Sequence, residues 1–168
     1  SYSHLYSLPT TGLRFFTVYG PYGRPDMACY KFTESILNGE PIDVYNNGDM
    51  CRDFTYIDDI VVGVLRVMES VPIPLVSDIT NSSAPYAIYN IGNNNPVSLA
   101  NFISAIENSC ERKAVKNFLP MQPGDVPVTS ADISDFDKNI GFTPSTTIEG
   151  GIAKYVNWHK TYKESKNA

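Results

Sequence analysis

Residues 13–26 read LRFFTVYGPYGRPD, and the other segments are interpreted outward from this stretch. Residues 13–19 are mainly aromatic and β-branched and are bounded by glycines, which predicts a short buried strand. The glycines and prolines that follow predict an irregular loop, and this loop carries Tyr22, Arg24 and Asp26. In an open parallel sheet, ligands bind beyond the carboxyl ends of the strands. An ordinary core strand followed by an ordinary turn fits the same pattern, so other residues must decide.

Composition excludes several classes of protein. The 168 residues suit one domain with a sizeable core. A net charge of -5 without a Lys/Arg-rich run argues against nucleic acid or an anionic membrane as a partner. No apolar stretch is long enough to span a bilayer, and no signal peptide is visible. Three widely spaced cysteines and two histidines, His4 and His159, suggest neither disulfides nor a metal site. We therefore expect a cytoplasmic protein.

Two segments follow the opening loop. Residues 27–38 place apolar side chains on one helical face, and Gly39 is a typical helix stop. Residues 42–45 alternate apolar and polar side chains, and residues 52–56 resume as a strand after an Asn-Gly turn. This order predicts a hairpin-like unit.

The next segments predict further elements. Asp58 and Asp59 precede an apolar stripe at helical spacing, and we interpret them as helix caps in preference to metal ligands. A polar loop is expected over residues 77–85, and residues 87–91 form an apolar strand. Ser98 is a candidate N-cap for the helix that follows it.

Several motifs in this order resemble one enzyme family. They are LRFFTVYGP followed by GRPDMA, RDFTYIDDIV at residues 52–61, YNIG at residues 89–92 and MQPGDVPVTSAD at residues 121–132. The chain resembles the NAD-dependent nucleotide-sugar epimerases and dehydratases of the extended short-chain dehydrogenase/reductase family, and among these most closely the UDP-glucuronate 4-epimerases. The resemblance implies an α/β fold in which residues 1–168 are the C-terminal substrate-binding part, with strands that would join a Rossmann-type sheet.

The resemblance also implies a UDP-sugar site. It matches Tyr45 to a residue against the uracil ring, Arg52 to an arginine on the diphosphate, and Gln122 and Asp125 to residues that contact the uridine. Galactose-type epimerases have an Arg where Gln122 stands, so an arginine clamp at that point is weakened or supplied elsewhere. Substrate-binding residues are expected at these positions: Thr17, Arg24, Val44, Tyr45, Arg52, Gln122 and Asp125.

Thr17 and Arg24 are assigned to the sugar. Galactose-type epimerases and many dehydratases have Asn at the position of Thr17. A hydroxyl with a nearby guanidinium suits the carboxylate that distinguishes glucuronate from glucose. Alternatively, Thr17 is only a strand residue and Arg24 only a solvated loop charge.

The cofactor and the catalytic residues are expected mostly outside this sequence. No glycine-rich turn cradles a dinucleotide here. By resemblance NAD is bound by an N-terminal domain, with Phe15 as the contact from this chain, and the catalytic Tyr-x-x-x-Lys pair lies upstream of Ser1. Tyr162 and Lys166 repeat that spacing at the other end of the chain, where no sheet precedes them, and we regard the match as chance. We therefore expect a catalytically inactive fragment.

The predicted function follows from the resemblance. The full-length enzyme, expected to be a cytoplasmic homodimer of polysaccharide biosynthesis, would convert UDP-glucuronate to UDP-galacturonate through a 4-keto sugar. A nucleotide-sugar 4,6-dehydratase or a UDP-glucuronate decarboxylase on the same scaffold is an alternative. A free-standing nucleotide-sugar-binding module without chemistry is another.

Overall fold

A computed structural model describes residues 1–73 and 84–167. The helix α1 (Tyr2–Tyr6) precedes β1 (Thr10–Phe15) and β2 (Thr17–Tyr19). The polar loop predicted over residues 77–85 falls largely outside the described residues. No helix in the described ranges has the length and apolar character needed to cross a membrane.

The single buried strand predicted at residues 13–19 is wrong in two respects. The strand breaks at Phe16, because β1 pairs in parallel with β6 (Tyr86–Ile91) whereas β2 pairs in parallel with β5 (Phe54–Tyr56). The Phe16 N–H still donates to the carbonyl of Ile91, but the Thr17 N–H donates to that of Asp53. Burial differs as well, since Phe15 is 51 % exposed and Tyr19 only 4 %. Thr17 thus begins the segment that changes partner.

The predicted hairpin is also wrong. The strand β3 (Pro41–Val44) pairs in parallel with β8 (Val115–Phe118), far along the chain. The strand β4 (Cys51–Arg52) pairs antiparallel with β7 (Val97–Ser98). A short 3-10 turn, η1 (Tyr45–Gly48), separates them. Alternation identifies a strand but not its partner, and three parallel pairs with intervening helices confirm the α/β class.

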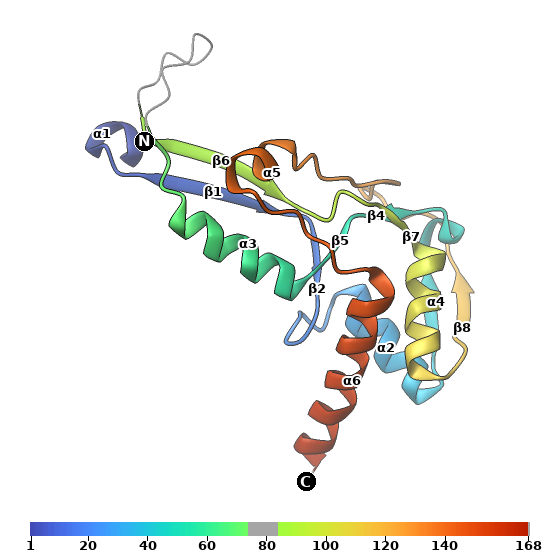
Figure 1. Cartoon of the computed structure of the whole chain (residues 1–168). Coiled ribbons are helices and arrows are strands. Elements are labelled where there is room, and N and C mark those ends of the chain that lie inside the picture. The colour runs from blue at the N-terminus through green and yellow to red at the C-terminus, as the bar shows by residue number, and fades with distance from the viewer. Residues whose placement is uncertain (74–83, 168) are drawn as a thin grey trace.

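Two hydrophobic clusters hold the helices (Figure 1). The first joins α2 (Ala28–Asn38), α4 (Leu99–Cys110) and α6 (Ile148–Asn167), and within it the rings of Phe54 and Phe102 stack at 4.2 Å. The second joins α3 (Ile57–Glu69), β6 and α5 (Ser134–Ile140) around the buried Ile91 and Phe136. Ile57 contacts both clusters, so the start of α3 links the two halves.

The helix ends follow the predictions in part. Gly39 ends α2 in the left-handed region at φ 76°, and the Ser98 hydroxyl accepts a hydrogen bond from the Asn101 N–H at the start of α4. The capping role predicted for Asp58 and Asp59 is wrong, because both lie inside the first turn of α3. Asp59 instead accepts hydrogen bonds from the N–H groups of residues 145 and 146, and so fixes the segment that leads into α6.

Candidate functional site

A pocket of about 240 Å³ lies where the start of α2 meets β4, β5 and α4. Four of the residues predicted to bind substrate line it together: Thr17, Tyr45, Arg52 and Asp125. They come from β2, η1, β4 and the loop after β8, four segments that are separate in sequence. The remaining lining residues are mostly apolar: Met27, Ala28, Asp43, Phe32, Met50, Phe54 and Leu99.

The side chain of Arg52 is held in a fixed position on the pocket wall. Its Nη2 donates to Asp125 Oδ1 at 2.6 Å, and its Nη1 donates to the carbonyls of Cys51 and Pro127 at 3.0 and 3.1 Å. A guanidinium has five N–H donors, so three are used and two are left for a ligand. The arginine therefore orders the 122–127 loop and keeps donors for an anion.

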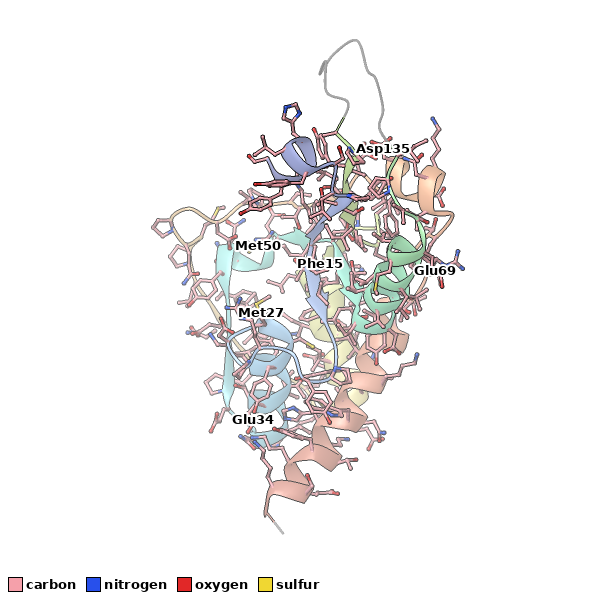
Figure 2. The ribbon with its side chains drawn as sticks, turned by 90° about the vertical axis from the view of Figure 1, so that its left-hand side faces the viewer. Phe15, Met27, Glu34, Met50, Glu69 and Asp135 are labelled. Carbon is pink, nitrogen blue, oxygen red and sulfur yellow. The ribbon has the colours of Figure 1, made fainter. Side chains whose placement is uncertain are left out.

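The start of α2 adds a second electropositive group to the same pocket. Met27 is the N-cap of this helix, and its side chain makes no capping hydrogen bond. The first N–H groups of a helix have no intrahelical acceptor, and the helix dipole favours negative charge there. Met27 and Ala28 both line the pocket, and Figure 2 labels Met27 at the start of α2 and Met50 before β4. Arg52 and the helix terminus together make the pocket suitable for phosphate groups.

An outer groove of about 470 Å³ continues the pocket along α2 and β3. Both hollows share Ala28, Phe32, Asp43 and Tyr45, so Tyr45 stands at their boundary. Gln122, the fifth predicted residue, lines the outer groove. An aromatic ring beside an amide suits the flat face and polar edge of a nucleobase.

Three predicted residues line neither hollow. Val44 is 2 % exposed, and its carbonyl accepts a hydrogen bond from the Leu119 N–H at 3.0 Å. The side chain of Arg24 is 75 % exposed and forms an ion pair with Asp26, which does line the outer groove. Asp26 raises the pKa of Arg24, and Arg24 in turn holds the pKa of Asp26 below its ordinary value. Phe15 projects at the end of β1.

Sequence reasoning missed Asp53, whose side chain is fully buried beside the site. Its carboxylate accepts hydrogen bonds from the N–H groups of Asn93, Asn94 and Ala131 at 2.9, 3.1 and 2.8 Å. Its carbonyl accepts the N–H of Thr17 at 3.2 Å. Asp53 thus joins β2, the turn after β6 and the end of the 122–131 segment. A charged residue inside the strand-like run 52–56 was the available signal, because such a residue is buried only with partners.

The sequence pattern of the NAD dependent epimerase/dehydratase family matches residues 1–92, more than half of the chain. The chain belongs to this family. Among its relatives, Protein CapI of Staphylococcus aureus is 54% identical over 168 residues, covering 96% of this chain and 50% of the relative. A probable UDP-glucuronate 4-epimerase of Rhizobium meliloti (strain 1021) is 46% identical, covering 95% and 49%. The chain spans about half the length of the curated relatives it matches.

Solved structures agree with this membership. The UDP-glucuronic acid 4-epimerase of Bacillus cereus, in complex with UDP-glucuronic acid and NAD, aligns with a TM-score of 0.82 at 32% identity. The alignment covers 96% of this chain and 48% of that one. The predicted family and the extended short-chain dehydrogenase/reductase fold are therefore confirmed.

The residues of this chain fit an NAD dinucleotide only at its edge. The sequence contains no Gly-x-Gly, so it lacks the glycine-rich turn that cradles a dinucleotide diphosphate. The exposed ring of Phe15 offers one aromatic contact. Tyr162 and Lys166 line neither hollow; the Lys166 ammonium lies 4.7 Å from the Tyr162 ring centroid, and that ring stacks on Trp158. His159 is buried in the first cluster, with Nε2 2.8 Å from Glu34 Oε2.

Proposed function

We propose that this chain is the substrate-binding part of an NAD-dependent UDP-glucuronate 4-epimerase, which interconverts UDP-glucuronate and UDP-galacturonate through a 4-keto sugar. One observation carries the proposal: Arg52, the uncapped start of α2, Tyr45 and Thr17 line a single pocket. Relatives named UDP-glucuronate 4-epimerase and a homologous structure that contains UDP-glucuronic acid support the choice of substrate. We call the full-length enzyme this chain together with the half of its relatives that it does not cover.

In this proposal the nucleotide occupies both hollows. The diphosphate binds between the two remaining donors of Arg52 and the first N–H groups of α2. The uracil ring stacks on Tyr45, with Gln122 and Asp125 toward the uridine and Val44 acting through its backbone. The 122–127 loop closes on this end because Arg52 binds Asp125.

The sugar then extends toward β2. Thr17 lies in the pocket with a hydroxyl that can donate to an oxygen of the sugar or of its carboxylate. Arg24 belongs to the next loop and supplies a guanidinium for a carboxylate. Both groups suit glucuronate better than glucose, because a site built to hydrogen-bond a group discriminates against an analogue without it.

The division of labour follows from what the chain contains. NAD, when bound, accepts the hydride from the sugar 4-position and returns it. The residues described here bind and orient the nucleotide sugar, and they include no acid/base pair on the pocket wall. We therefore propose that the NAD diphosphate and the catalytic Tyr/Lys pair belong to the other half. The family resemblance also predicts a homodimer in the cytoplasm.

Two measurements test this function. Calorimetry on the purified 168-residue chain should detect UDP and UDP-glucuronate, and the protein should purify without NAD absorbance. The full-length enzyme should form UDP-galacturonate from UDP-glucuronate, whereas the 168-residue chain should give no turnover even with added NAD. Turnover by the chain alone would refute the division of labour. A full-length enzyme that releases a 4-keto-6-deoxy sugar or a pentose would assign the scaffold to a dehydratase or a decarboxylase.

A further inference from the structure

The loop from Gly20 to Met27, which carries Arg24, lies against the C-terminal helix through one exposed aromatic residue. Tyr22 is 81 % exposed, yet its ring centroid is 5.1 Å from that of Trp158 and 6.1 Å from that of Tyr162. Trp158 and Tyr162 themselves stack at 4.9 Å with an angle of 18° between the rings. The ring of Tyr22 thus covers the edge of a preformed aromatic surface on α6.

The backbone of Tyr22 is consistent with a specific role for its ring. Its φ is 60°, in the left-handed region that non-glycine residues rarely adopt. The next N–H, of Gly23, donates to the carbonyl of Gly20 at 3.2 Å and closes a tight turn. A glycine would adopt this conformation without cost, so the ring contact with α6 offsets the strain of a tyrosine at this position.

A second contact attaches the preceding strand to the same face of α6. Tyr19 ends β2, and its side chain lies so close to Gly151 that a Cβ there would be 2.0 Å from the Tyr19 Oη. Gly151, Tyr155, Trp158 and Tyr162 are spaced by four, three and four residues, which places them on one helical face. This face of α6 holds both the end of β2, where Thr17 begins, and the loop that follows.

The far end of the loop is the substrate pocket. Met27 is both the last loop residue and the N-cap of α2, and it lines the pocket. Its N–H donates to the carbonyl of Arg24 at 3.2 Å, so the backbone of Arg24 is coupled to the pocket wall. The loop is therefore fixed at α6 by Tyr22 and at α2 by Met27, with Arg24 between the two.

From these contacts we propose that Tyr22 is a positioning residue for Arg24. Its ring, docked on Trp158 and Tyr162, sets the place from which the Arg24 guanidinium meets the carboxylate of the substrate. This inference rests on the proposed function. It adds a sugar-specificity role for α6, whose aromatic face lies outside both substrate hollows.

The central test compares Tyr22→Gly with Tyr22→Phe in the full-length enzyme. Glycine keeps the left-handed turn and removes only the ring, whereas phenylalanine keeps the ring. With Tyr22→Gly, kcat/KM for UDP-glucuronate should fall roughly tenfold, the size of one weakened charge-assisted hydrogen bond, and the Kd for UDP should stay unchanged. Tyr22→Phe should retain wild-type values. Trp158→Leu, which removes the same contact from the helix side, should reproduce the Tyr22→Gly pattern.

A double-mutant cycle identifies the residue through which Tyr22 acts. Because Tyr22 serves Arg24, the loss in Tyr22→Gly/Arg24→Ala should equal the loss in Arg24→Ala alone. Additive losses would overturn the inference, as would equal losses for UDP and UDP-glucuronate, which indicate a purely structural role. If Arg24→Ala lowers kcat/KM and Tyr22→Gly does not, only the inference about Tyr22 fails. If wild type does not prefer UDP-glucuronate to UDP-glucose, the proposed substrate fails with it.

The docked ring can also be checked without activity. Trp158 is the sole tryptophan of the 168-residue chain, so its fluorescence reports this contact alone. Acrylamide quenching of Trp158 should increase in Tyr22→Gly and stay at the wild-type level in Tyr22→Phe. Identical quenching in all three proteins would show that the ring does not cover Trp158 in solution and would overturn the inference.

Discussion

The guanidinium of Arg52 donates a 2.6 Å hydrogen bond to the carboxylate of Asp125, although 73 residues separate the two in sequence. Their side chains are 19% and 35% exposed, so the ion pair is largely shielded from water. It ties β4 to the 122–127 loop and leaves two guanidinium donors facing the pocket. The same arginine therefore shapes the site and binds in it.

Arg52→Ala in the full-length enzyme should weaken UDP and UDP-glucuronate equally. A charge-assisted hydrogen bond contributes about 1.5 to 3 kcal/mol, so both Kd values should rise about tenfold or more. Asp125→Asn is the matched control for the loop, since it keeps an acceptor for Arg52 and should have a smaller effect. Calorimetric titrations give all four constants. An unchanged Kd for UDP in Arg52→Ala would assign Arg52 to the fold and not to the site.

Thr17→Val and Arg24→Ala should impair the use of UDP-glucuronate and spare the binding of UDP. Valine keeps the shape of threonine and removes the hydroxyl, while alanine removes the guanidinium. The quantities to compare are kcat/KM for UDP-glucuronate and UDP-glucose, with wild type strongly preferring the former. Equal losses on both sugars would remove the carboxylate assignment and leave a general nucleotide-sugar enzyme.

Asp53→Ala should destabilise the protein strongly. The substitution leaves three N–H groups without their acceptor, and a buried unpaired donor costs about 1 to 3 kcal/mol, so a loss of at least about 3 kcal/mol is expected. Urea unfolding followed by circular dichroism measures it. Asp58→Ala removes an exposed carboxylate nearby and should change the free energy of unfolding little. A similar midpoint for both variants would contradict the role of Asp53.

Glu107 should make stability depend on pH at the acid end. Its side chain is 4% exposed; burial alone would raise its pKa, but hydrogen bonds from Lys116, Lys113 and the Ala114 N–H outweigh burial and lower the pKa from 4.5 to about 2. Because the folded pKa is the lower one, the stabilisation is complete above about pH 4.5 and is lost as the pH falls toward 2.

The corresponding experiment compares Glu107→Gln with wild type across this range. The variant should be less stable by roughly 1 to 3 kcal/mol at pH 7, and the difference should shrink between pH 4.5 and pH 2. Urea midpoints at pH 7, 5 and 3 are sufficient to follow it. Glu69→Gln, at an exposed glutamate, is the control. A difference that stays constant with pH would show that Glu107 acts through packing and not through its charge.

The sequence by itself determined the features that depend on neighbouring residues. Helix α2 with its stop at Gly39, and helix α4 with Ser98 as cap, follow from side-chain period and local hydrogen bonding. The family followed from motifs whose order spans the chain. These signals are local, so they survive without knowledge of the fold.

Only the tertiary structure decided which distant segments meet. The partners of β3 and β4, the break at Phe16 and the pairing of Arg52 with Asp125 all depend on contacts across long sequence separations. Alternation of side chains is the same whichever strand lies alongside, and a charge in a strand does not name the N–H groups that satisfy it. Asp53 and Tyr22 were invisible for this reason: each acts through groups that only folding brings within reach.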